Sequence, residues 1–128
     1  MRYLLVHRVD ESSPEASNPS PEFMAAMGDF MTEIGKTGVL LTAEGVLPSA
    51  TGARVRHSAG KSTVTDGPFT ETREVIGGFA IVDVRSREEV VHWATRYAAL
   101  FDDVEVEIRR IAEFSDLPSG GPDAGEAS

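Results

Sequence analysis

Two ionisable residues, His7 and Glu44, occupy positions from which they could act on a small molecule. His7 lies inside an apolar N-terminal run, and an imidazole titrates near neutral pH and is easily tuned. Glu44 precedes Gly45, and a glycine lets a strand bend and aim a carboxylate into a cavity. The pair predicts a catalytic base and a carboxylate that orients it. The alternative is a core or interface histidine and a carboxylate in water.

A second group of polar residues surrounds residues 66–68, Asp-Gly-Pro, which are typical of a turn. The Asp66 side chain is expected to accept a backbone N–H bond as in an Asx turn. The residues that follow would lie near the mouth of a cavity, and Arg54 could pair either with an anionic ligand or with the acids there. The predicted ligand-binding residues are Arg54, Asp66, Phe69, Thr70 and Glu71.

The sequence predicts no metal site and no cofactor. No two histidines have the i, i+4 spacing of a metal-binding helix, and no string combines two histidines with a carboxylate. Phosphate loops, dinucleotide fingerprints and nucleophile elbows are also missing. A lyase-type or isomerase-type proton transfer is the chemistry that His7 and Glu44 would support without a cofactor.

Charge and composition indicate the kind of partner. The chain has 128 residues, the size of one domain, and a net charge of −9 from 21 acidic and 12 basic residues. That balance opposes binding to nucleic acid or to an anionic membrane surface. There are no cysteines, no signal-peptide pattern and no apolar stretch near the ~20 residues of a membrane helix. We therefore expect a soluble, cytoplasmic protein.

The hydrophobic spacing predicts an α+β domain over residues 1–114, followed by a disordered acidic Gly/Pro/Ser tail over 115–128. Two helices and four main strands in the order β-α-β-hairpin-β-α-β follow the ferredoxin-like plan with an inserted β-hairpin. Residues 69–76 are either an irregular loop or a short helical turn. The predicted strands are 2–9, 39–46, 79–84 and 104–111, the helices are 22–37 and 87–100, and the hairpin strands are 53–58 and 61–65.

The first strand is apolar on both sides, with Leu4 and Val6 pointing one way and Tyr3, Leu5 and Val9 the other. Both helices of this plan lie on one face of the sheet, so the other face needs a partner. We expect a homodimer, with the side that carries Tyr3, Leu5 and His7 forming its interior.

Three strings of the sequence resemble the YCII-related family, in the branch named after its DGPF motif. They are DGPFTETREVIGGFAIVDV (66–84), GVLLTAEGVLP (38–48) and the opening MRYLLV, and the resemblance covers residues 1–112. It implies a dimeric α+β barrel, in which two ferredoxin-like sheets face each other.

The resemblance implies two functions. Some YCII-like proteins are enzymes of small-molecule breakdown with a His–Asp pair whose histidine lies in the first helix. Residues 22–37 contain no histidine, so that pair is not carried over. Members of the DGPF branch are encoded beside extracytoplasmic-function sigma factors. The chain is therefore either a small-molecule enzyme or ligand binder with a pocket in the barrel interior, or a non-catalytic regulatory module associated with such a sigma factor.

Overall fold

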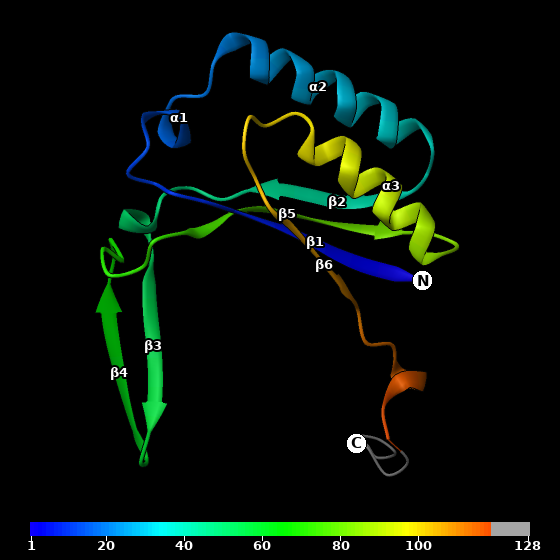
Figure 1. The fold of residues 1–128 in the computed structure, drawn as a ribbon. Coiled ribbons are helices and arrows are strands. Elements are labelled where there is room, and N and C mark those ends of the chain that lie inside the picture. The colour runs from blue at the N-terminus through cyan, green and yellow to red at the C-terminus, as the bar shows by residue number, and fades with distance from the viewer. Residues whose placement is uncertain (119–128) are drawn as a thin grey trace.

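An antiparallel sheet with both long helices on one face forms the body of the protein (Figure 1). The computed structural model describes residues 1–118. The strand order is β2-β5-β1-β6, and each neighbouring pair is antiparallel. The mixed α+β class is therefore confirmed. The strands are β1 (Arg2–Val9), β2 (Leu40–Gly45), β5 (Val75–Asp83) and β6 (Val106–Arg110), and the helices are α2 (Pro21–Lys36) and α3 (Arg87–Ala98).

Local capping residues set the ends of both helices. The Ser20 hydroxyl accepts a 3.1 Å bond from the Phe23 N–H at the start of α2. Gly38, just after that helix, has a φ of +79°, a conformation that glycine adopts without a steric cost. At the start of α3 the Ser86 hydroxyl accepts a 3.1 Å bond from the Glu89 N–H. These caps agree with the helix ends that the sequence predicts.

The hydrophobic core fills the space between the sheet and the two helices. Tyr3 and Leu5 are buried in it. The prediction that these two side chains line the uncovered face is therefore wrong, because β1 presents them to the helices. The other buried members of the core are Phe30, Ile34, Val39, Val82, Val84, Val90, Trp93 and Ala94.

The opposite face of the sheet carries its own apolar residues and no helix. Since neighbouring residues of a strand point to opposite faces, Leu4 and Val6 lie on this uncovered face. Their cross-strand partners on β5 are Ile81 and Phe79, which share the same side. We call these four residues the apolar sheet face. Over residues 1–118 the sheet is open and does not close into a barrel.

A hairpin of β3 (Ala53–Ser58) and β4 (Lys61–Asp66) forms a separate two-stranded sheet. In Figure 1 it projects from one end of the body, away from the helices. Three short helices complete the described chain: α1 (Pro14–Ser17) within the loop predicted over 10–21, η1 (Ser49–Thr51) and η2 (Phe114–Asp116). The tail predicted from residue 115 onward begins within η2, and residues 119–128 lie outside the described part of the chain.

Candidate functional site

His7 is buried at the end of the core where α3 finishes, with only 8% of its surface exposed. Its Nδ1 lies 2.7 Å from the hydroxyl oxygen of Tyr97 on α3. Its ring also packs against Phe101, with 5.0 Å between the ring centroids. Tyr97, near the end of α3, and Phe101, just after it, therefore fix the orientation of the imidazole.

Two glycines of β5 make room for this ring. A Cβ atom on Gly78, which pairs with His7 across the sheet, would lie 2.8 Å from the imidazole Cε1. A Cβ on Gly77 would lie 2.9 Å from Nε2. Side-chain carbons do not approach this closely without displacing a neighbour. The Gly77-Gly78 pair, which interrupts an otherwise apolar strand, is thus explained by the His7 ring together with Val9, whose Cγ1 would lie 2.8 Å from a Cβ on Gly77.

Burial favours the neutral form of both members of the His7–Tyr97 pair. It lowers the pKa of His7 below its ordinary value and raises the pKa of Tyr97 to about 12. Within residues 1–118 the Tyr97 hydroxyl has no hydrogen-bond partner except His7. The tautomer of the imidazole decides which of the two groups donates. In either case this bond occupies Nδ1.

Glu44 lies on the other side of the sheet. It pairs across the sheet with Phe79, and Phe79 pairs with Val6, so these three side chains share the uncovered face. His7 is directed to the helices and its partner is Tyr97. The prediction that Glu44 orients the His7 imidazole is therefore wrong. Catalytic roles for the two residues separately stay predictions.

We expect His7 to make the protein less stable as the pH falls below about 6.5. The unfolded chain protonates His7 near this ordinary value, whereas the folded protein, in which its pKa is lowered, does not. The unfolded state then binds more protons, and the free energy of unfolding falls by at most about 1.4 kcal/mol per pH unit. Urea unfolding at pH 7.5 and pH 5.5 measures the slope.

Two variants test whether His7 causes this pH dependence of the free energy of unfolding. His7→Gln should flatten the dependence between pH 7.5 and 5.5, because it removes the titrating group. His57→Gln, in the exposed hairpin, should leave the wild-type slope unchanged. A His7→Gln protein that loses as much stability on acidification as the wild type would show that His7 is charged in the folded state.

The turn over residues 66–69 is held by a buried serine from a distant part of the chain. The hydroxyl of Ser49 accepts a 2.9 Å bond from the Phe69 N–H and donates to the Glu11 carboxylate. The Ser49 N–H donates to the same carboxylate at 2.8 Å. Hydrogen bonds from the Ser49 side chain and backbone lower the pKa of Glu11. Three segments of the chain thus meet at one hydroxyl.

Gly67 is the residue that this close approach requires. A Cβ at that position would lie 1.7 Å from the carbonyl oxygen of Ser49, which is not a feasible contact. Asp66 has a different role from the one predicted. Within residues 1–118 its carboxylate accepts no hydrogen bond: Pro68 has no N–H to offer, and the Phe69 N–H is donated to Ser49. The Asx-turn prediction for Asp66 is therefore wrong.

Arg54 connects the hairpin to the loop that follows the turn. Its guanidinium lies 3.9 Å from the centroid of the Phe69 ring. It also donates to the Glu71 carboxylate and, at 2.7 Å, to the Thr72 hydroxyl. Of the five predicted ligand-binding residues, the structure brings Arg54, Phe69 and Glu71 together. Thr70 and Asp66 are exposed, and neither side chain has a hydrogen bond in the described chain.

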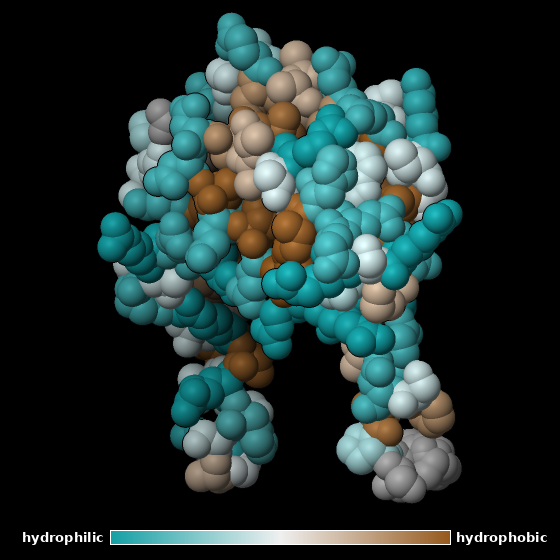
Figure 2. Space-filling view, turned by 45° about the vertical axis from the view of Figure 1, so that its right-hand side comes forward, coloured by the Kyte–Doolittle hydropathy of each residue, from teal (hydrophilic) through white to brown (hydrophobic). Residues whose placement is uncertain are grey.

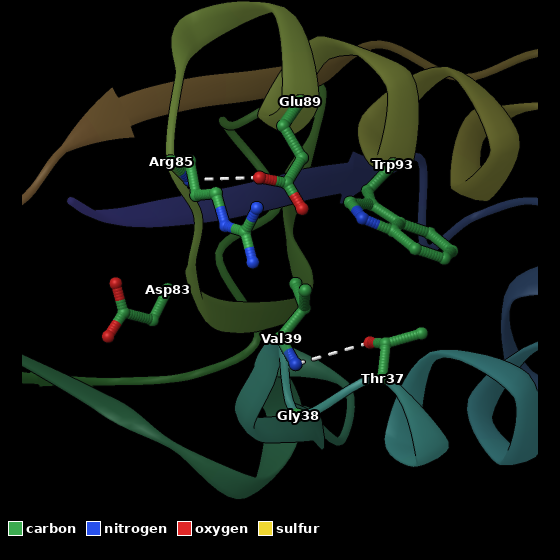
Figure 3. A pocket seen from close by; sticks show the side chains of 7 residues that line it. All are labelled: Thr37, Gly38, Val39, Asp83, Arg85, Glu89 and Trp93. Atoms are coloured by element: carbon green, nitrogen blue, oxygen red, sulfur yellow. Dashed lines mark hydrogen bonds between the residues drawn. The ribbon is translucent and has the colours of Figure 1, made fainter.

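A surface pocket of about 480 Å³ lies at the other end of the sheet (Figure 3). None of the predicted site residues lines it. The Arg85 guanidinium points into the pocket beside the Glu89 carboxylate, and Trp93 closes one side. Most of its lining is charged or polar, whereas small-molecule sites are mostly apolar with few polar groups. The seven lining residues are Thr37, Gly38, Val39, Asp83, Arg85, Glu89 and Trp93.

Sequence reasoning missed three of the residues that matter here. Tyr97 lies in the helix predicted over 87–100, and nothing in the spacing of that helix marks its bond to His7. Glu11 and Ser49 lie in polar loops 38 residues apart in the sequence. The Gly77-Gly78 pair was the one available signal, because adjacent glycines in a strand indicate a close approach by another group.

The part of the chain that the structure describes contains no helix that is long and apolar enough to cross a membrane. It also contains no group of three or more His, Asp or Glu side chains arranged to hold a metal ion.

Comparison with known proteins gives the family. A curated uncharacterized protein of Rhizobium meliloti (strain 1021) is 40% identical over 71 residues, which is 56% of this chain. The match spans 55% of that relative's own length. The family model of the YCII-related domain matches residues 1–115. The chain therefore belongs to the YCII-related family.

Proposed function

We propose that the protein is a homodimeric small-molecule binder, whose two sheets face each other and enclose the ligand between them. The observation that carries this proposal is the apolar sheet face, which no helix of residues 1–118 covers. Val6 is only 9% exposed, whereas Leu4, Phe79 and Ile81 are half-buried and leave part of their apolar surface in water. A contiguous apolar patch on an uncovered sheet face marks an interaction site.

The topology supports the finer description of the fold. The order β2-β5-β1-β6, with two helices on one face, supports a ferredoxin-like plan in which the hairpin is an insertion. Two such sheets packed face to face would form the dimeric α+β barrel that the DGPF-branch resemblance implies. A twofold axis lets one apolar face cover its own copy.

The residues around the apolar sheet face indicate the class of ligand. Glu44 stands beside Phe79, and its carboxylate has no hydrogen bond or ion pair within residues 1–118. Across the face, Glu107 is already paired with Arg8 at 2.9 Å and with Arg109 at 3.1 Å. A carboxylate next to an aromatic ring suits a cation. The ligand that fits is an apolar molecule that carries an amine.

Binding fits the geometry better than proton transfer does. The His7 imidazole lies on the helix side of the sheet, and its Nδ1 is hydrogen-bonded to the Tyr97 hydroxyl. It therefore does not face the proposed ligand space, and Glu44 has no imidazole beside it.

We expect Leu4→Lys to dissociate the dimer without unfolding the chain, because it places a charge in the centre of a surface that must be dry. Sedimentation velocity over a dilution series measures the dissociation constant. Met24→Lys, at an exposed position on α2, is the control and should leave the dissociation constant unchanged. A Leu4→Lys protein that remains as dimeric as the wild type would exclude this face as the interface.

The ligand class is tested with phenethylamine and its uncharged analogue 2-phenylethanol. We expect phenethylamine to raise the melting temperature of the wild type more than the alcohol does. Glu44→Gln should abolish the difference between the two, and Glu22→Gln, in the first turn of α2, should preserve it. Equal shifts with both compounds in the wild type would contradict the proposal.

A further inference from the structure

We propose that the hairpin β3–β4, residues 53–66, is an arm that grips a second copy of this chain. The turn at residues 66–69, with its partners Glu11, Ser49 and Arg54, is the root that fixes the direction of this arm. The inference rests on the proposed homodimer and adds to it an interface outside the apolar sheet face.

Beyond its root, the arm packs against no other described part of its own chain. Its two strands pair with each other and with no other described strand, and every residue of both is exposed. Two-stranded hairpins standing alone in water are only marginally stable. At the centre of the arm Val55 and Val64 lie directly opposite each other, 70% and 63% exposed. An apolar pair on such an element indicates a surface that covers it.

The two faces of the arm differ in chemistry. Because side chains alternate along a strand, Val55 and Val64 share one face with the ring of His57. The other face carries Arg54, Arg56 and Lys61 among threonines and a serine. Arg54 is held by the root, which leaves the charges of Arg56 and Lys61 without a partner in the described chain.

Charge complementarity favours a second copy as the occupant. Three basic and one acidic side chain give the arm a net charge of +2, which leaves −11 on the rest of a chain whose total is −9. The arm is therefore attracted to the body of any other copy of this protein. The same acidic balance opposes the alternative of a nucleic acid bound by the basic face.

The arm is long enough to reach the side of a partner's sheet. Six residues per strand at about 3.3 Å each give roughly 20 Å. Two sheets packed face to face are only about 10 Å apart. The arm therefore extends past the layer of the partner's sheet and runs along its side.

The root holds the arm at a fixed angle. The Ser49 hydroxyl binds the Phe69 N–H at 2.9 Å, and the Gly67 N–H donates to the Gly52 carbonyl at 2.9 Å. Arg54 lies on the Phe69 ring on the opposite side of the turn. Few of these bonds belong to regular secondary structure. Their common effect is to position β3 and β4 relative to the body, which gives the Asp-Gly-Pro-Phe string a structural purpose.

The C-terminal segment forms a second projection on the same side of the body (Figure 2). A bidentate pair between Arg2 and Glu113, at 2.8 and 3.0 Å, anchors it to β1. It carries Phe114, 71% exposed. Figure 2 shows an open hollow between this segment and the arm. The body of a second copy in this hollow would contact both projections, each of which carries exposed apolar side chains.

The test is a double substitution that keeps the strand propensity of the arm. Val55→Thr with Val64→Thr removes apolar surface while retaining β-branched side chains. Because each dimer contains two arms, the double substitution removes four valines per dimer. We therefore expect the dissociation constant measured by sedimentation velocity to rise at least about tenfold. The control, Met24→Thr with Val91→Thr, removes exposed apolar groups from the helix layer and should change it less than about twofold.

The possible results of these measurements distinguish the arm contact from the face-to-face dimer. A wild-type dimer whose arm variant associates equally well overturns the arm and leaves the face-to-face dimer standing. A wild type that is monomeric at tens of micromolar overturns both. Amide hydrogen exchange gives an independent readout that needs no substitution. Residues 53–66 should exchange several-fold more slowly in concentrated than in dilute wild-type protein, and identical exchange at both concentrations in a dimerising protein also overturns the arm.

Discussion

Gly67→Ala is expected to destabilise the protein by about 2 kcal/mol or more, the upper part of the range for overpacking a tight site. The added Cβ would lie 1.7 Å from the Ser49 carbonyl oxygen. That oxygen belongs to the backbone, so it cannot rotate away as a side chain would. The turn must then separate from η1, and the bond between the Ser49 hydroxyl and the Phe69 N–H is lost with it. Urea unfolding gives the loss of free energy.

Gly52→Ala is the matched control. The Gly52 carbonyl accepts the hydrogen bond from the Gly67 N–H, so the two glycines are neighbours in the fold. Its φ of −121° is open to any residue, and a Cβ there would lie 3.7 Å from the nearest atom, an ordinary contact. We expect a change within about 0.5 kcal/mol. Equal losses for both variants would mean that the contact with Ser49 is not the cause of the cost.

The Gly67 variant also separates the two proposed interfaces. If the root directs the arm, Gly67→Ala should weaken dimerisation even in the fraction of molecules that remains folded. The apolar sheet face is distant in sequence and retains Leu4, Val6, Phe79 and Ile81 unchanged. A variant that loses stability but dimerises normally would leave the turn as a purely structural element.

Local signals predicted most of the secondary structure. The cap at Ser20, the glycine after α2 and the alternation of β6 all act over a few residues, and both long helices and most strands lie close to the predicted ranges. β5 is the exception: it begins at Val75, inside the segment 69–76 that was predicted as an irregular loop or a short helical turn. The short α1 was also missed, because only Pro14 marks its start. Four residues are too few to show periodicity.

The choice of sheet face was not predictable from alternation. Tyr3 and Leu5 are as apolar as Leu4 and Val6, so the pattern shows two buried sides without saying which one the helices cover. The helix-facing side is settled by packing against Phe30 and Ile34, which is information from another part of the chain. This one reversal moved His7 from the proposed interior to the helix side.

Partners of polar groups were the least predictable feature. Arg54, Phe69 and Glu71 lie together because the hairpin and the turn are neighbours in sequence, and their role in ligand binding stays a prediction. Tyr97 lies 90 residues from His7, and Ser49 lies 20 residues from Phe69. Such bonds depend on the folded arrangement of distant segments, and no spacing rule reports them.

Gly78→Ala is the second large effect, and its cost should depend on His7. The new Cβ would lie 2.8 Å from the imidazole Cε1 and 3.0 Å from the Glu44 carbonyl oxygen. The ring has little freedom to move, since Tyr97 holds Nδ1 at 2.7 Å and Phe101 packs on its face. We expect a loss of about 2 kcal/mol in the free energy of unfolding.

A double-mutant cycle identifies the imidazole as the cause. In a His7→Ala background the main obstacle is gone, so Gly78→Ala should cost at least about 1 kcal/mol less than in the wild type. The remaining cost reflects the Glu44 carbonyl. Gly45→Ala is the control: Gly45 pairs with Gly78 across β2 and β5, and a Cβ there meets no atom within 4 Å. Its effect should be small in both backgrounds. Additive losses for His7→Ala and Gly78→Ala would show that the imidazole does not rest on this glycine.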